Sequence, residues 1–253
     1  MNYFLHIIIM INIYVILTVS SNLLIGMTNL LSLGQAAFYG IGAYIAVLCL
    51  MILHLPLIPT ILLVMIVTAS FSLLLALPSL RLKGDYFVLA TLGFQLIVFT
   101  VLYNWVSLTR GPYGVSGIPA PKLFGFIEIS GILPFLILSS ILALFTIWIF
   151  YKLINSPFGR VLKGVREDEI SVLSIGRSVT NYKIMVFVIS SAFIGIAGFL
   201  YASYVTYIDP TSFTLDESIF ILSALLIGGL GNIKGPVVGS IFVIVLPELL
   251  RFV

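Results

Sequence analysis

Six residues in the apolar stretches of this 253-residue chain carry the groups with which it could do chemistry. They are two glycines, which offer their backbone, and four hydroxyl or amide side chains: Gly34, Gln35, Thr91, Gln95, Gly231 and Asn232. Uncharged donors and acceptors of this kind can replace the water around a zwitterionic solute inside an apolar layer. They therefore predict a path for a polar solute. The alternative is that they only hydrogen-bond neighbouring helices, and the sequence leaves both interpretations open.

Other kinds of chemistry are disfavoured by what the apolar stretches lack. No Asp, Glu, Lys or Arg lies at the centre of a predicted span, where such a charge costs about 2.5–3.5 kcal/mol, and this counts against a cation-coupled carrier. The sequence has no HExxH, no GxSxG, no paired intramembrane aspartates and no P-loop, which counts against an enzyme. Cys49 stands alone, so no metal site is expected. What remains is a pathway for a solute that is moved by energy supplied elsewhere.

The composition places these residues in a membrane protein. Hydrophobic residues make up 61% of the chain and charged residues 8%, whereas soluble domains carry about 25% charged residues. A helix needs about 20 apolar residues to cross a bilayer, and the candidate spans are 3–24, 36–53, 57–77, 86–106, 131–151, 184–205 and the long 218–250. We expect an all-α fold over residues 1–253, one transmembrane domain of about eight helices or half-helices with no sheet, in which Pro78 ends the third span.

Two polar interruptions break the apolar blocks at corresponding places. One runs from Asn29 to Gln35 and the other from Gly228 to Pro236. At an offset of 197 residues, 33–35 (Leu-Gly-Gln) falls on 230–232 (Leu-Gly-Asn), and Gly42 falls on Gly239. Interrupted apolar segments in two halves are typical of transporters with an internal repeat. The alternative is an ordinary turn between helices at the membrane surface, and it stays open.

Small residues predict where helices approach each other closely. They recur at spacings of three or four in the sets Ala36 and Gly40, Gly42 and Ala46, and Ser191, Gly195, Gly198 and Ala202. Such spacing lets two backbones meet inside a membrane.

The segment 152–183 is the one long hydrophilic stretch, and it holds six of the twelve Lys and Arg residues. Ser156 before Pro157 is typical of a helix start, and Asp168 and Gly176 could cap and end a second helix. We predict two short amphipathic helices broken near Gly164 and Gly176. Their apolar face would consist of Val161, Val165, Val172, Ile175 and Val179. The pattern fits a docking surface and a solvated connecting loop equally.

The distribution of basic residues predicts the orientation. Segment 152–183 and the turn 78–85, with Arg81 and Lys83, carry eight of the twelve, whereas 107–130 carries Arg110 and Lys122. By the positive-inside rule, the first two are cytoplasmic, and 107–130 is external together with 206–217.

Five stretches together resemble one family of membrane proteins. They are 29–44 (NLLSLGQAAFYGIGAY), 80–94 (LRLKGDYFVLATLGF), 104–119 (NWVSLTRGPYGVSGIP), 156–176 (SPFGRVLKGVREDEISVLSIG) and 227–239 (IGGLGNIKGPVVG). In this order they resemble the inner-membrane permeases of bacterial ABC importers, specifically LivM-type branched-chain amino-acid permeases. The chain departs from the family's pattern at Gln35, where His is frequent, and at Lys234, where an aromatic residue is frequent.

The resemblance implies a non-enzymatic transport subunit of the bacterial inner membrane without a cofactor of its own. It implies a second permease of the LivH type, two ATP-binding subunits that hydrolyse ATP, a periplasmic or lipid-anchored solute-binding protein, membrane lipid, and no nucleic acid. Segment 156–176 would form coupling helices in a groove of the ATPase, with Arg160, Val165, Arg166, Glu167, Asp168, Val172, Ile175 and Gly176 as the contact residues; the three apolar side chains would be the buried anchors. The solute would be leucine, isoleucine or valine. The alternative is a self-sufficient channel or facilitator for a small polar solute such as urea or an amide.

Overall fold

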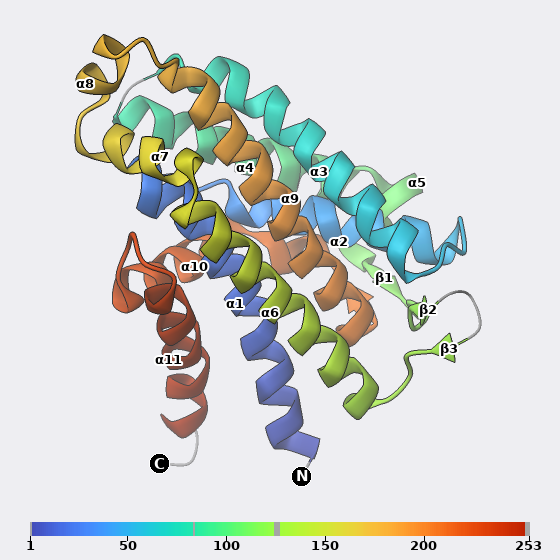
Figure 1. The fold of residues 1–253 in the computed structure, drawn as a ribbon. Helices are drawn as coiled ribbons and strands as arrows, with labels where there is room; N and C mark the ends of the chain where they lie inside the picture. Colours follow the sequence, from blue (N-terminus) through green and yellow to red (C-terminus); the bar gives the residue numbers. More distant parts are fainter. Residues whose placement is uncertain (1, 83, 124–126, 251–253) are drawn as a thin grey trace.

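Eight long helices form the bundle in a computed structural model that describes residues 2–82, 84–123 and 127–250 (Figure 1); Lys83 lies outside the described residues. They are α1 (Asn2–Thr28), α2 (Gln35–Met51), α3 (Leu57–Ser79), α4 (Asp85–Asn104), α6 (Ile132–Asn155), α9 (Val179–Val205), α10 (Leu215–Gly228) and α11 (Lys234–Leu250). The shorter helices are α5 (Val106–Thr109), η1 (Gly111–Tyr113), α7 (Pro157–Glu167), α8 (Glu169–Ser174) and η2 (Pro210–Phe213). The prediction of an all-α bundle of about eight helices or half-helices is confirmed.

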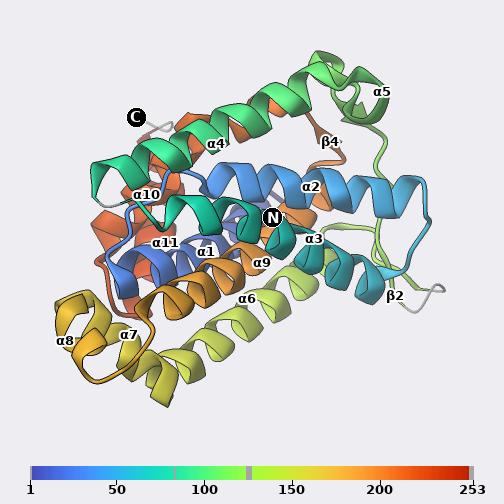
Figure 2. The same ribbon diagram turned by 90° about the horizontal axis from the view of Figure 1, so that it is seen from above.

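Three of the helices, α1, α2 and α9, lie at the centre of the bundle, and 14 of the 17 residues of α2 are buried. Within the described residues, α1, α3, α4, α6 and α9 are long and apolar enough to cross a membrane. In the most apolar stretch of each, 67% of the residues of α1 and 72% of those of α9 are buried, against 33% or less in α3, α4 and α6. The outer helices instead point Leu and Ile side chains such as Leu62, Ile66 and Leu144 outward, as helices surrounded by lipid do. Figure 2 shows the order α4, α2, α9 and α6 across the bundle.

Glycines bring α2 and α9 into backbone contact. A Cβ atom on Gly42 would lie 2.5 Å from Gly195 Cα, and one on Gly198 would lie 2.3 Å from the carbonyl oxygen of Tyr39. Real Cβ atoms do not approach backbone so closely, so these positions accept no side chain. The close approach predicted from the small residues of these two helices is confirmed.

The two ends of the bundle differ. Helices α7 and α8 and the α3–α4 turn lie at one end, which we call the α8 end (Figure 1). The opposite end carries two antiparallel ladders of two residues per strand, and we call it the ladder end: β1 (Val115–Ser116) pairs with β4 (Tyr207–Ile208), and β2 (Lys122–Leu123) pairs with β3 (Ile127–Glu128). The expectation of no sheet is corrected by these two short ladders. The β1–β4 ladder joins segments 107–130 and 206–217, which were predicted to share one side.

Both predicted interruptions separate helices. α1 ends at Thr28 and α2 begins at Gln35, with Asn29 in the left-handed region at φ 54°. The long apolar stretch 218–250 is divided into α10 and α11 by residues 229–233. With 14 residues, α10 is about 21 Å long at 1.5 Å per residue, so it cannot span a hydrocarbon core of about 30 Å. Helix α3 continues one residue past Pro78, which corrects the expected end of the third span.

Cysteine labelling tests the orientation of the two ends. Ser116 in β1 and Ser171 in α8 are both exposed, and they lie at opposite ends of the bundle. Ser116→Cys should react with a membrane-impermeant thiol reagent in intact cells, and Ser171→Cys only after permeabilisation, because the positive-inside rule predicts that the basic end faces the cytoplasm. The native Cys49 is buried, which keeps the background low. Labelling of both cysteines from the same side would contradict the orientation.

Candidate functional site

Three helices meet at the start of α2. The hydroxyl of Ser218 in α10 accepts a hydrogen bond from the backbone N–H of Ala36 at 3.0 Å, and the hydroxyl of Thr91 in α4 accepts one from the N–H of Leu33 at 3.1 Å. These side chains satisfy donors that the interrupted backbone before α2 leaves without helical partners. Thr91 therefore lies beside Gly34, as the predicted path requires. Ser218 was missed because it begins an apolar run and resembles an ordinary span residue.

Gln35 points into a small internal cavity. The cavity has a volume of about 10 Å³ and lies between α1, α2 and α9, where Ser21, Gln35 and Ser190 contribute its polar groups. The Gln35 Oε1 atom and both serine hydroxyls are buried, and none has a hydrogen-bond partner among the described residues. A space of this size holds about one water molecule, so it is too small to admit an amino acid. The arrangement offers three polar groups that only a widened cavity would present to a solute.

Gln95 lies one helical turn beyond Thr91 and connects α4 to the segment before α10. Its side-chain Nε2 donates to the carbonyl oxygen of Phe213 at 2.7 Å, and its buried Oε1 accepts from no described group. Gln95 thus has the structural role that the alternative interpretation assigned to it, and it keeps one free acceptor. The structure groups Gly34, Gln35, Thr91 and Gln95 around the start of α2.

Gly231 and Asn232 lie apart from this group. They form the turn between α10 and α11, and the side chain of Asn22 in α1 holds both: its Oδ1 accepts from the Gly231 N–H at 3.1 Å, and its Nδ2 donates to the Asn232 carbonyl at 2.9 Å. The turn also contacts α7, because a Cβ on Gly231 would lie 1.9 Å from Arg166 Nη1. The sequence had placed these two residues with Gln35 by the repeat offset. The structure places them beside the segment at the α8 end instead.

Two further polar residues of the interior were not singled out from the sequence. Asn22 belongs to the polar run 20–22 (Ser-Ser-Asn) inside an apolar span, and that run was the available signal. Glu217 was assigned to the external segment 206–217, yet it lies in the first turn of α10 and its Oε1 accepts a hydrogen bond from the Tyr14 hydroxyl at 2.6 Å. An acid directly before an apolar run was the signal there. No described group of three His, Cys, Asp or Glu side chains is placed to hold a metal ion.

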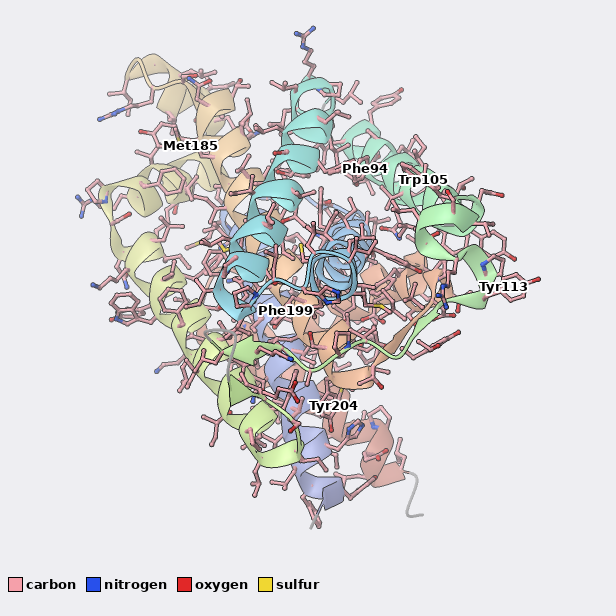
Figure 3. The ribbon with its side chains drawn as sticks, turned by 90° about the vertical axis from the view of Figure 1, so that its right-hand side faces the viewer. Phe94, Trp105, Tyr113, Met185, Phe199 and Tyr204 are labelled. Carbon is pink, nitrogen blue, oxygen red and sulfur yellow. The ribbon has the colours of Figure 1, made fainter. Side chains whose placement is uncertain are left out.

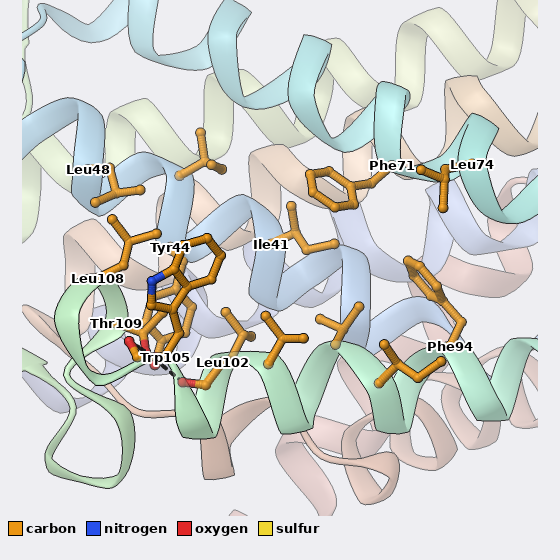
Figure 4. A pocket seen from close by; sticks show the side chains of 14 residues that line it. Ile41, Tyr44, Leu48, Phe71, Leu74, Phe94, Leu102, Trp105, Leu108 and Thr109 are labelled. Carbon is orange, nitrogen blue, oxygen red and sulfur yellow. Dashed lines mark hydrogen bonds between the residues drawn. The ribbon is translucent and has the colours of Figure 1, made fainter.

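A larger groove lies on the outer side of α2, between α3 and α4. Its volume is about 330 Å³, and its walls are aliphatic and aromatic side chains such as Ile41, Phe71 and Phe94, with Trp105 and Thr109 at the ladder end (Figure 4). Figure 3 shows Phe94 and Trp105 following each other along this side of the molecule. The groove can hold an aliphatic chain, but it offers almost no partner for a charged or zwitterionic group.

The segment at the α8 end is folded as two short helices. Ser156 caps α7, where its Oγ accepts from the Gly159 N–H, and Pro157 is the first helical residue. Asp168 caps α8, and hydrogen bonds from the Ser171 hydroxyl and the Ile170 N–H lower the pKa of its carboxyl below the usual value. The predicted caps are confirmed. The predicted break at Gly164 is wrong, because α7 continues to Glu167 and Gly164 instead gives room to Val172, whose Cγ2 would be 3.1 Å from an added Cβ.

The apolar residues of this segment divide into an inner and an outer group. Val165 and Val172 are 2% and 6% exposed and form a small cluster with Val161 and Val179 inside the chain. Ile170, Leu173 and Ile175 of α8 and its C-terminus are 74%, 55% and 78% exposed. Of the expected partner anchors, Val165 and Val172 therefore face inward, and only Ile175 faces outward. The outer group is bordered by charged residues, since Arg160, Arg166, Glu167 and Asp168 are all exposed; Gly176, at φ 78°, ends the segment.

The segment is also fixed to the bundle. Lys183 in α9 forms an ion pair with Glu169 in α8, and the rings of Phe158 and Tyr182 lie 5.4 Å apart between α7 and α9. Leu162 of α7 is fully buried in the main core. These contacts hold α7 and α8 against α9 and the main core.

Comparison with known proteins gives one consistent result. The family model described as the permease component of branched-chain amino acid transport systems matches residues 3–253. The high-affinity branched-chain amino acid transport system permease proteins LivM of Salmonella typhimurium and Escherichia coli are 36% and 34% identical over 94% of this chain and 61% of their own length. A probable branched-chain amino acid transport permease protein LivM of Methanocaldococcus jannaschii is 33% identical over 69% of this chain and 50% of its own length. The chain thus spans about three fifths of the length of the two bacterial relatives. No solved structure matches it.

Proposed function

This chain belongs to the family of permease components of branched-chain amino acid transport systems, and we propose that it is a transmembrane subunit of an ATP-driven importer for leucine, isoleucine and valine. In this proposal it works in the bacterial inner membrane, paired with a second permease of the LivH type. Two ATP-binding subunits dock at the α8 end, and a periplasmic or lipid-anchored binding protein delivers the solute at the ladder end.

The observation that carries the proposal is the similarity to two LivM proteins over 94% of the chain. The geometry supports it in two places. The polar residues around the start of α2 offer uncharged donors and acceptors within an apolar bundle, which suits a solute with one positive and one negative group. The outer group of α8 exposes three large apolar side chains beyond the transmembrane helices, which suits a protein partner more than solvent.

The alternative, a self-sufficient channel, gives the outer group no role. A channel needs no ATPase, and three exposed Ile and Leu side chains on a segment braced by an ion pair would then only lower its solubility. The closed cavity at Gln35 also suits a protein that opens its path when energy is supplied.

The decisive experiment is reconstitution. The chain, co-expressed with candidate permease, ATPase and binding-protein genes from the same genome, should co-purify with the ATPase subunits. In liposomes, L-leucine with the binding protein should stimulate ATP hydrolysis and accumulate inside against its gradient. Flux of L-leucine without ATP would identify a channel, and ATP-driven accumulation of urea or an amide in place of leucine would correct the substrate.

Gln95→Leu tests the path. The change removes the donor to the Phe213 carbonyl and the free Oε1 together, and an unsatisfied buried carbonyl costs about 1–3 kcal/mol. We expect leucine uptake to fall about 5- to 30-fold, the factor that 1–2 kcal/mol corresponds to, while the complex still assembles. Thr100→Leu is the matched control, because Thr100 is an exposed hydroxyl on the same helix. Uptake by Gln95→Leu equal to that of the control would remove Gln95 from the path.

A further inference from the structure

Glu217 is a carboxylate inside the bundle for which the polar path gives no role. It lies in the first turn of α10, is only partly accessible, and receives the hydroxyl of Tyr14 from α1 at 2.6 Å. Its neighbour Asp216 is exposed. One acid of this pair therefore faces out of the bundle, and the other is held against α1.

No cation of the described chain balances Glu217. The ion pairs among the described residues join Lys122 to Glu128 and Lys183 to Glu169, at the ladder end and the α8 end respectively. A carboxylate in an apolar bundle is costly unless a positive group pairs with it, and an intramembrane acid of this kind marks a functional site. A cation that pairs with Glu217 would therefore come from outside the described residues.

The surroundings of Glu217 fit an ammonium group. Tyr14 stacks edge to face with Phe220 at 5.4 Å, and Tyr39 lies 5.5 Å from Tyr201 and 5.1 Å from Phe213, all ring centroid distances. Tyr39 lies one turn along α2 from Ala36, whose N–H binds the hydroxyl of Ser218, the residue directly after Glu217. Aromatic faces attract cations. In addition, the hydroxyl of Tyr39 is buried and has no hydrogen-bond partner among the described residues, so it can accept from an N–H donor.

The position of Glu217 connects this cluster to the path. The next residue, Ser218, accepts the N–H of Ala36, which directly follows Gln35. The preceding segment, η2, holds the carbonyl that Gln95 binds and follows β4 at the ladder end. A solute that enters from the ladder end therefore meets Glu217 before the uncharged groups around Gln35.

We propose that Glu217, together with Tyr14 and Tyr39, binds the primary ammonium group of the solute in the outer half of the path. The proposal rests on the proposed function and adds the residue that recognises the charged amino end. The competing role is structural: an acid in the first turn stabilises a helix N-terminus, and the bond from Tyr14 braces α10 against α1. The negative charge of Glu217 is essential to ammonium binding but not to the structural role.

Carboxyl labelling in the assembled transporter separates the two roles without any substitution. A hydrophobic carbodiimide converts an accessible carboxyl group in a membrane to a stable N-acylurea, which is located in the Glu217 peptide by mass spectrometry. L-Leucine and 3-methylbutan-1-amine, which both carry an ammonium group, should slow labelling of Glu217 severalfold. The carboxylate 4-methylpentanoate, which lacks one, should not. Asp216, in the same peptide, is the internal control and should be labelled equally under all conditions. Equal labelling of Glu217 with and without the amine would overturn the proposal.

Uptake supplies the second measurement. Glu217→Gln keeps the size of the side chain and an acceptor for Tyr14 but removes the charge, so leucine uptake should fall about tenfold or more. Asp216→Asn removes the neighbouring exposed charge and should transport as the wild type does. Normal uptake by Glu217→Gln would contradict the ammonium site. If wild-type cells take up no leucine, the proposed substrate fails, while protection by the amine still decides the ammonium site.

Discussion

Replacing Ile170 and Ile175 by aspartate should detach the ATPase subunits and abolish leucine uptake, while the permease still inserts and pairs with its sister subunit. Both side chains are more than 70% exposed at the α8 end, so the change leaves the packing within the chain intact. Burying one such side chain contributes about 1.5–3 kcal/mol, and two contribute about 3–6 kcal/mol. Loss of this binding free energy should weaken ATPase binding on the order of a hundredfold or more. The measurements are a pull-down of the ATPases from detergent and uptake in cells.

The choice of these residues follows from the two groups of apolar side chains in the segment. Val172→Asp would place a charge in the cluster with Val165 and Val179, and a loss of binding would then report misfolding. Thr180→Asp with Asn181→Asp is the matched control, because it adds the same two charges to exposed positions in the first turn of α9. If Ile170→Asp with Ile175→Asp retains the ATPases and transports normally, the segment is a connecting loop and the coupling assignment is wrong.

Gly42→Val should prevent the bundle from forming. The new Cβ would lie 2.5 Å from both Cα and the carbonyl oxygen of Gly195, and backbone in the centre of two packed helices cannot move aside as a side chain can. Overpacking costs about 1–3 kcal/mol where side chains adjust, and more where they cannot, out of a total stability of about 5–15 kcal/mol. We expect little monodisperse protein in detergent and a large loss of thermal stability in what remains, as measured by size-exclusion chromatography after heating.

Gly93→Val in α4 is the control for this change. An added Cβ at Gly93 meets nothing within 4 Å, so this variant should be extracted and remain stable as the wild type does. Wild-type stability of Gly42→Val would mean that α2 and α9 do not meet as described.

Local patterns were sufficient for the features that depend on neighbours in sequence. The helices could be predicted from the apolar spans, because a backbone inside a membrane must satisfy its own hydrogen bonds and a helix does so. The caps at Ser156 and Asp168 were also predictable, since a cap is a contact over two or three residues. Of the groups around Gln35, Thr91 and Gln95 were selected from the sequence, whereas Ser21 and Ser190 were not, because buried hydroxyls recur throughout the spans.

Features that depend on long-range contacts were missed or misplaced. Asn22 binds residues 209 and 210 positions away, and no spacing rule connects them. Ile175 had the helical spacing of the inner valines, but α8 ends at Ser174, so Ile175 lies past the helix and does not continue the face of Val172. Gly164 resembled a helix breaker, but it lies inside α7, where its lack of a side chain makes room for Val172 of α8. The partners of Asn22 lie far away in the sequence, whereas Gly164 and Ile175 depend on where α7 and α8 end and how the two helices pack on each other.

The central position of α1 sets a condition on how the protein is made. This helix is synthesised before its neighbours α9 and α11. They supply the surroundings of its hydroxyl and amide groups, since Thr18 donates to the Pro236 carbonyl and Asn22 holds the turn before α11. About 150 residues separate the end of α1 from the start of α9, which is roughly 8–30 s of translation at 5–20 residues per second. Throughout that time the polar run 20–22 is without its final partners. The nascent helix must therefore be retained by the insertion machinery or by α2 and α6, and substitutions that make this run more polar should act on membrane insertion before they act on transport.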